Sequence, residues 1–245
     1  IVIKKIIKKA DAIVVPGTLH KEYFQKLGVN ENKIYIMPNV SNIKDDTVKP
    51  SLNSVNKKTI LYVGRLIKRK GVNYLIDAYK QLVDDNINDT QLIIVGSGEE
   101  RYNLEKQVKK YNLTKNIIFT GEIKNNELIS YYKTAELVVV PSINYGVGDP
   151  WVFVVNEAMY FKNPVVVTDA VGASKDMVRD NGYIVKEKNS KELYVAMKKI
   201  ITDSKLQKHM GDISKQIIEE EYRYNHMVSG FNKAVFNVLK EDNEN

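Results

Sequence analysis

The sequence has no cysteine, and this absence excludes several kinds of site at once. Without thiols there is no disulfide framework, no thiolate metal site and no cysteine nucleophile. The three histidines, His20, His209 and His226, lie too far apart in the sequence to form a spaced ligand motif, so no metal site is expected. Every apolar run is far shorter than the roughly 18 residues that a membrane span needs.

The chain also lacks an excess of acidic residues, because its 245 residues carry a formal net charge of +7. A basic protein attracts anions, among them phosphates, nucleotides, acidic lipids and nucleic acids. There is no interleaving of basic with aromatic residues and no groove-reading motif, so we expect no nucleic-acid partner. One basic cluster stands out because two glycines flank it, and it consists of Arg65, Lys68, Arg69 and Lys70.

The sequence does not begin with Met but with Ile1, inside a segment (1–9, IVIKKIIKK) patterned as an amphipathic helix. We expect residues 1–50 to be the remnant of an N-terminal domain together with a linker, which we place at 43–58. Thr18 is a candidate cap for the helix that follows the short run DAIVVPG. The segment 1–9 fits two interpretations. It is either a surface helix that packs on the missing part of that domain, which we favour, or a peripheral contact with an anionic membrane.

From residue 59 onward, continuous apolar runs alternate with helical patterns. The runs are TILYVG, QLIIVG, NIIFTG, ELVVVPS, PVVVTD and GYIV, and the helical patterns cover 71–83, 99–111, 126–135, 150–162, 173–179 and 190–203. Runs without polar alternation are typical of strands buried on both faces, and hence of a parallel sheet covered by helices. We therefore predict an α/β fold, with a doubly wound Rossmann-like parallel sheet over 51–205. Helices over 206–245, with a break near 219–227, complete the chain.

Such sheets bind ligands beyond the carboxyl ends of their strands, and the first of these ends carries the basic cluster. Gly64 ends a buried run and Gly71 opens a helix, so the backbone can turn tightly between them. Arg65 offers a planar fork to phosphate oxygens, and Lys70 places a charge at a helix N-terminus that itself favours anions. The segment matches neither the dinucleotide glycine fingerprint nor the phosphate-loop pattern. The alternative is a basic surface loop without a ligand.

Two carboxylates, Asp149 and Glu157, form a second candidate group. Pro150 suits the first position of a helix, which would make Asp149 its N-cap. Eight helical residues rise about 12 Å and rotate about 80°, so both carboxylates would lie on one side of the helix. Carboxylates accept hydrogen bonds from hydroxyls, so the pair could hold two polyols at either end of a diphosphate. The alternatives are a simple cap for Asp149 and an exposed helix charge for Glu157.

Taken together, these motifs resemble those of one family. GRLxxxKG, GSG, FTG, PS, DPWxxxVNEAM and NPVVVTDxxGA follow one another in the order of the nucleotide-binding half of glycosyltransferase family 4. The resemblance covers about residues 10–205. It implies the GT-B fold, of which this chain would supply the C-terminal, donor-binding domain, and an enzyme that retains anomeric configuration.

The resemblance also implies roles for individual residues. Arg65 and Lys70, with Arg69 beside them, would contact the donor diphosphate. Asp149 would hold the transferred sugar, and Glu157 the nucleotide ribose. Arg65, Lys70 and Asp149 are thus the implied catalytic residues. The other implied donor contacts are backbone groups near the base and amides that face the sugar and phosphates, belonging to Ile123 and Lys124 and to Val152 and Phe153.

Two positions depart from the family's pattern, and both lie at the donor-sugar end. Asp149 is one methylene shorter than the usual Glu, and Val152 stands where the family has a small Gly. The identity of the sugar is therefore not implied. The family's acceptor domain would precede this chain, and residues 206–245 are similar to the helices that cross back toward it.

These inferences predict a retaining glycosyltransferase of the hexosyltransferase type, incomplete in this chain, that acts in polysaccharide or glycolipid biosynthesis. The expected partners are a UDP- or GDP-sugar donor and a hydroxyl acceptor on a glycan or lipid, with no cofactor or metal. The expected location is cytoplasmic, with contact at the inner membrane surface left open. Two alternatives remain: a non-catalytic nucleotide-sugar-binding module, and a nucleotide-sugar epimerase or sugar phosphorylase on the same fold.

Overall fold

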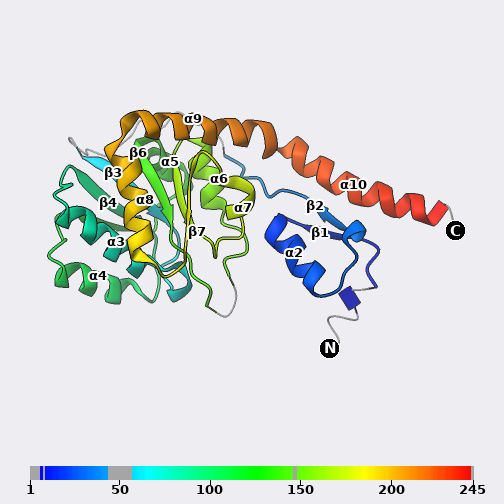
Figure 1. Cartoon of the computed structure of the whole chain (residues 1–245), viewed down its shortest axis with the longest axis horizontal. Helices are drawn as coiled ribbons and strands as arrows, with labels where there is room; N and C mark the ends of the chain where they lie inside the picture. The colour runs from blue at the N-terminus through cyan, green and yellow to red at the C-terminus, as the bar shows by residue number, and fades with distance from the viewer. Residues whose placement is uncertain (1–5, 8, 44–56, 146–147, 244–245) are drawn as a thin grey trace.

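The computed structural model describes residues 6–7, 9–43, 57–145 and 148–243. They form a main body around a six-stranded sheet and a smaller N-terminal segment that lies beneath the last helix (Figure 1). Most of the predicted helix at 1–9 and of the predicted linker at 43–58 falls outside the described residues.

Strands and helices alternate through the main body, as the apolar runs predict. The strands are β3 (Lys58–Val63), β4 (Thr90–Val95), β5 (Ile117–Gly121), β6 (Ala135–Val140), β7 (Val165–Thr168) and β8 (Gly182–Val185). The helices are α3 (Val72–Asp84), α4 (Arg101–Lys110), α5 (Asn125–Thr134), α6 (Phe153–Tyr160), α7 (Ser174–Met177) and α8 (Ser190–Thr202).

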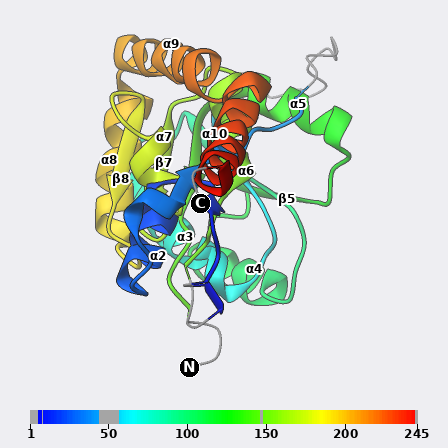
Figure 2. The same ribbon diagram turned by 90° about the vertical axis from the view of Figure 1, so that its right-hand side faces the viewer.

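The sheet is wholly parallel, and its strands lie in the order β5-β4-β3-β6-β7-β8. Successive residues of the central strand enter different apolar layers: Ile60 and Tyr62 join one buried cluster, and Leu61 joins the other. Helices cover both layers, and α8 and α5 lie on opposite sides of the molecule (Figure 2). Burial of both faces explains why the strands show no polar alternation, and it confirms the predicted doubly wound fold.

The N-terminal segment contains β1 (Ile13–Val15), α2 (Thr18–Lys26) and β2 (Ile34–Ile36), and its two strands pair in parallel. Helix α9 (Ser204–Glu221) lies along the main body, and α10 (Tyr224–Asn243) extends from it over the small sheet (Figure 1). The Nδ2 atom of Asn237 in α10 donates to the Tyr35 hydroxyl at 3.0 Å. The break between the two helices falls where the sequence predicts it. Within the described ranges, no helix combines the length and apolar character needed to cross a membrane.

The cap of α2 differs from the prediction. Gly17 occupies the N-cap position and Thr18 is the first helical residue, so Thr18 does not cap its own helix. Instead the Asp176 carboxylate, from α7, accepts a hydrogen bond from the Thr18 amide at 2.9 Å and another from the Thr18 hydroxyl. A carboxylate at a helix N-terminus satisfies unpaired amides and suits the helix dipole. Asp176 therefore caps α2 from the main body and joins the two parts of the molecule.

We predict that Asp176→Ala loosens α2 while leaving the large sheet intact, because the amide and the hydroxyl of Thr18 at the start of α2 lose their acceptor. The expected loss of stability is about 1 kcal/mol, and hydrogen exchange at the amides of the first turn of α2 should accelerate. Lys175→Ala is the control, because it removes the neighbouring ion pair with Glu22, whose partners are both solvent-exposed. Equal exchange in α2 of both variants would contradict the assigned cap.

Candidate functional site

At the centre of the sheet, between β3 and β6, the direction in which successive strands are added reverses. From β3 the chain proceeds outward through β4 to β5, whereas β6 lies on the other side of β3 and leads outward to β7 and β8. In open parallel sheets this reversal leaves a crevice beyond the carboxyl ends of the two central strands. The loops that follow β3 and β6 border that crevice, and they contain the basic cluster and Asp149.

The loop after β3 is held close to the loop after β6. Residues Lys68–Lys70 form a short 3-10 helix that ends at Gly71 in the left-handed conformation, with φ of 61°. A Cβ atom at Gly71 would lie 2.1 Å from the carbonyl oxygen of Pro141, so only glycine fits there. The amide of Ile143 donates to the carbonyl of Arg69 at 2.8 Å. The predicted tight turn is thus confirmed, and its partner is the β6 loop.

The carboxylate of Asp149 is the electrostatic centre of this arrangement. Its Oδ1 accepts from Arg69 at 2.9 Å, and its Oδ2 accepts from Lys70 at 2.5 Å and from the Ser142 hydroxyl at 2.8 Å. The Asp149 side chain is only 5% exposed. Because a buried charge is stable only when paired and hydrogen-bonded, these three donors fix its position.

The backbone of Asp149 also binds a third loop, the one after β7. Its amide donates to the Ala170 carbonyl at 3.0 Å, and its own carbonyl accepts from the Gly172 amide at 2.7 Å. A Cβ atom at Gly172 would lie 1.6 Å from the Pro150 carbonyl oxygen, so the two loops are in backbone contact. Asp149 therefore connects the loops after β3, β6 and β7.

This geometry corrects the predicted helix around the carboxylate pair. Helix α6 begins at Phe153 with Val152 as its N-cap, so Asp149 is not the cap and Pro150 is not the first helical residue. The spacing of eight helical residues therefore does not apply to Asp149 and Glu157. Asp149 instead forms ion pairs with Arg69 and Lys70, and it lies in the loop before α6.

Glu157 lies in the second turn of α6 and faces α5. The hydroxyl of Tyr132 donates to Glu157 Oε2 at 2.7 Å. Burial raises the pKa of the Glu157 carboxyl, and the bond from Tyr132 acts in the opposite direction. The carboxylate lines a cavity of about 230 Å³ between α5, α6 and residues 42–43. The sequence gives no sign of the contact with Tyr132, because its helical pattern indicates only packing.

Arg65 lies at the surface of the loop that contains the ion pairs. Its carbonyl accepts from the buried Tyr62 hydroxyl at 2.9 Å, which anchors the backbone. Burial first, and then the nearby charge of Asp149, raise the pKa of Tyr62, so its phenol stays protonated as a donor. Within the described part of the chain, no carboxylate pairs with the exposed Arg65 guanidinium. Arg69 and Lys70, by contrast, each form an ion pair with Asp149.

The other residues predicted to contact the donor lie at the N-terminus of α6 and just before α5. At the N-terminus of α6, Val152 is buried and Phe153 is exposed, and no described side chain caps the first amides of that helix. The Val152 side chain packs in the apolar core of the main body. Ile123 packs partly against the same core, and the exposed Lys124 is the N-cap residue of α5.

A cavity of about 680 Å³ separates α2 from the loops after β6, β7 and β8. Asp149, Pro150 and Gly172 line its main-body side, and His20 and Tyr23 of α2 line the other. The Nδ1 atom of His20 is buried without a partner in the described structure. Burial lowers the pKa of His20, while the charge of Asp176 opposes that shift. The sequence, in which His20 stands alone, does not reveal that the fold brings it to the same cavity as Asp149.

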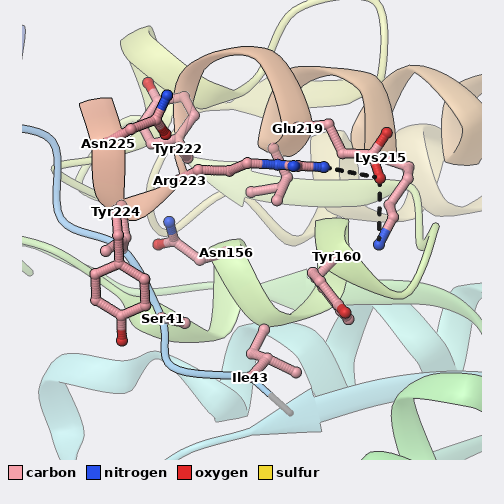
Figure 3. Close-up of a pocket in the computed structure, with 12 residues that line it drawn as sticks. Ser41, Ile43, Asn156, Tyr160, Lys215, Glu219, Tyr222, Arg223, Tyr224 and Asn225 are labelled. Atoms are coloured by element: carbon pink, nitrogen blue, oxygen red, sulfur yellow. Dashed lines mark ion pairs between the residues drawn. The ribbon is translucent and has the colours of Figure 1, made fainter. Parts of the chain in front are cut away.

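A third cavity, of about 470 Å³, lies where residues 40–43, α6 and the break between α9 and α10 meet (Figure 3). Glu219 stands between two cations there, 3.4 Å from Arg223 and 3.9 Å from Lys215. Asn156 reaches the same region and donates to the carbonyl of Asn39 at 3.0 Å. The lining includes none of the residues predicted to bind the donor.

The amino-acid sequence is similar to those of known glycosyltransferases. The family model described as glycosyl transferases group 1 matches residues 44–217. An uncharacterized glycosyltransferase of Methanocaldococcus jannaschii is 29% identical over 187 residues, which cover 76% of this chain and 45% of that protein. A capsular polysaccharide biosynthesis glycosyltransferase of Staphylococcus aureus is 25% identical, over 86% of this chain and 57% of that protein. The chain thus spans about half the length of these relatives.

Solved structures share the fold. The crystal structure of Anabaena HepE in complex with UDP matches with a TM-score of 0.81 and 19% identity, over 93% of this chain and 64% of that one. Sucrose-phosphate synthase from Thermosynechococcus elongatus matches with a TM-score of 0.83 and 24% identity, over 98% of this chain and 61% of that one. These likenesses agree with the parallel α/β architecture described above.

We predict that Asp149→Ala destabilises the protein, because Arg69 and Lys70 would be left as partly buried cations without a counter-charge. The free energy of unfolding, measured with urea, should fall by about 3 kcal/mol. The control is Asp212→Ala, which removes an exposed ion pair with Lys162 and should change stability little. Similar losses in the two variants would show that Asp149 does not hold the loops together.

Proposed function

The chain belongs to the group 1 glycosyl transferases, and on this premise we propose that it is the donor-binding half of a retaining glycosyltransferase of family 4, of the hexosyltransferase type. The observation that carries the proposal is the basic loop at the sheet's reversal point. There Arg65 is exposed and unpaired within the described residues, while Lys70 is held in place by Asp149.

The charge of this loop suits a nucleoside diphosphate. The loop has four cations, Arg65, Lys68, Arg69 and Lys70, and Asp149 cancels one of these positive charges. The positive charge that remains suits the two ionised phosphates of a nucleotide-sugar. Amides at the first turn of α6 add to the attraction, because a helix N-terminus favours anions. Asp149 thus keeps Lys70 oriented without neutralising the whole site.

Catalysis in this proposal depends on stabilising the leaving diphosphate. The bond between the sugar's anomeric carbon and the phosphate oxygen breaks, and a bond from that carbon to the acceptor oxygen forms on the same face. The acceptor's hydroxyl proton passes to the departing phosphate. Arg65 and Lys70 stabilise the charge that develops on the phosphate, which is the largest contribution such a site can make. Two fixed cations can serve in place of a divalent metal, so the proposal includes neither metal nor cofactor.

The nucleoside would extend from the diphosphate toward α5. In the proposal, the Glu157 carboxylate accepts hydrogen bonds from the ribose, and backbone groups of Ile123 and Lys124 face the base. The amides of Val152 and Phe153 face the sugar and phosphates. UDP is the first candidate donor nucleotide, because the similar Anabaena structure was solved with UDP; a GDP-sugar is the alternative.

The cavity between α2 and the main body is the proposed entrance for the acceptor. It borders Asp149 and contains hydroxyl, imidazole, carboxylate and amide groups, which suit a polyhydroxylated molecule. A glycan acceptor is supported by the capsular polysaccharide relative, and a glycolipid remains the alternative. The cytoplasmic location and the contact with the inner membrane surface stay predictions.

One observation favours a second candidate, a binding module without transferase activity. The carboxylate of Asp149, one methylene shorter than the family's Glu, accepts hydrogen bonds from Arg69 and Lys70 of the loop. A binding module would use Asp149 in this way alone, without a contact to the transferred sugar. Acceptor-dependent release of UDP from a UDP-sugar separates the two candidates, because a binding module would retain the donor unchanged.

We predict that Arg65→Ala weakens UDP binding on the order of tenfold, because a charge-assisted contact with phosphate is lost. The unfolding midpoint should stay unchanged, since Arg65 has no carboxylate partner within the described structure. Lys68→Ala is a matched control, because Lys68 is an exposed cation in the same loop that is not assigned to the donor. Calorimetry with UDP provides the measurement. Unchanged affinity in Arg65→Ala, or an equal loss in both variants, would remove the specific phosphate contact from the proposal.

A further inference from the structure

The contact between Tyr132 and Glu157 has a feature that simple packing does not require. Tyr132 donates to Oε2 of Glu157 at 2.7 Å. Among the described residues, Oε1 of Glu157 accepts no hydrogen bond, and Glu157 lines a cavity. The carboxylate is therefore held by one oxygen and presents the other toward open space.

The position of Tyr132 is fixed independently of Glu157. Its side chain is 2% exposed, and its ring stacks on Phe161 with centroids 5.8 Å apart and planes 9° from parallel. Its carbonyl accepts from Nδ2 of the buried Asn163 at 3.0 Å, and the same Nδ2 donates to the Ala135 carbonyl at 2.7 Å. Because the phenol is clamped by these contacts, Tyr132 determines where the Glu157 carboxylate lies.

The cavity around this pair is neutral apart from Glu157. Its described lining combines apolar side chains with amides from α5, from α6 and the residue after it, and from residues 42–43. It consists of Asn42, Ile43, Asn125, Asn126, Leu128, Ile129, Tyr132, Glu157 and Phe161. A carboxylate among amides suits a neutral ligand rich in hydroxyls. Such a ligand would use the free oxygen of Glu157 without displacing Tyr132.

We propose that Tyr132 is a positioning residue for donor recognition: its hydroxyl orients the Glu157 carboxylate so that Oε1 accepts a hydrogen bond from a ribose hydroxyl. The inference rests on the proposed function, since it takes Glu157 as the residue that binds ribose. It assigns to the donor site a residue that need not touch the nucleotide itself.

If Tyr132 orients Glu157, the pH dependence of nucleotide binding should change when the Tyr132 hydroxyl is removed. Burial raises the pKa of Glu157 and the Tyr132 hydrogen bond lowers it. Two cations lie over neighbouring rings: Lys133 of α5 over Phe161, which lines the same cavity, and Lys215 of α9 over Tyr160. Loss of the Tyr132 hydroxyl should therefore raise the Glu157 pKa further. Ribose-dependent binding needs the ionised form, so it should fail at a higher pH in the variant than in the wild type.

The test compares UDP with 2′,3′-dideoxy-UDP by calorimetry between about pH 5 and 8. Tyr132→Phe keeps the stacked ring and removes the hydroxyl. It should weaken UDP binding on the order of threefold to tenfold near neutral pH, move the acid loss of UDP binding to higher pH, and leave dideoxy-UDP unaffected. Tyr131→Phe is the matched control, because Tyr131 is the preceding residue of α5 and is partly buried against the same core. It should change none of these properties.

A second measurement does not depend on ligand. Carbon-13 NMR titration of the Glu157 carboxyl should show a higher pKa in Tyr132→Phe than in the wild type or in Tyr131→Phe. An unchanged titration, or an equal loss of affinity for both nucleotides, would overturn the positioning role. If the wild type binds UDP and dideoxy-UDP equally well, Glu157 does not bind ribose and the proposed function is at fault. If the wild type discriminates between them and Tyr132→Phe does so equally at every pH, the positioning role alone is wrong.

Discussion

The buried carboxylate of Asp149 is the constraint on which the site's geometry depends. A charge with so little solvent contact requires several donors, and the available ones lie on separate loops: Arg69 and Lys70 after β3, and Ser142 after β6. Its backbone adds the loop after β7. Asp149 therefore connects the three loops beside the reversal point of the sheet. In the proposed function, Asp149 contributes to donor binding by keeping Lys70 in place.

The two ends of the proposed donor site depend on different physical effects. At the phosphate end, the loop keeps a surplus of positive charge, and the exposed Arg65 is its most accessible cation. At the nucleoside end, the side chains are largely neutral, and a single carboxylate is held by the hydroxyl of Tyr132. A nucleotide-sugar has the same division, with charged phosphates beside a neutral, hydroxyl-rich ribose. The match between these two halves supports a nucleotide-sugar over a simple phosphate.

The sequence predicts local structure well here and long-range partners poorly. The apolar runs locate the strands because burial on both faces leaves a pattern in consecutive residues, and the glycine-flanked basic loop is equally local. The caps fail for the opposite reason. In the sequence, Thr18 and Asp149 both look like helix caps. Their partners, Asp176 for Thr18 and the pair Arg69 and Lys70 for Asp149, come from distant parts of the chain. The role of Tyr132 is not predicted from the sequence for the same reason, because its hydroxyl contacts Glu157 of another helix. Only the fold brings these groups together.

The most direct test of the account is a crystal structure of this chain with UDP bound. The account predicts diphosphate oxygens within hydrogen-bond distance of the Arg65 guanidinium, the Lys70 ammonium and the first amides of α6, with a ribose hydroxyl on Glu157. UDP bound in the cavity at the break between α9 and α10 (Figure 3), with the basic loop unoccupied, would contradict it.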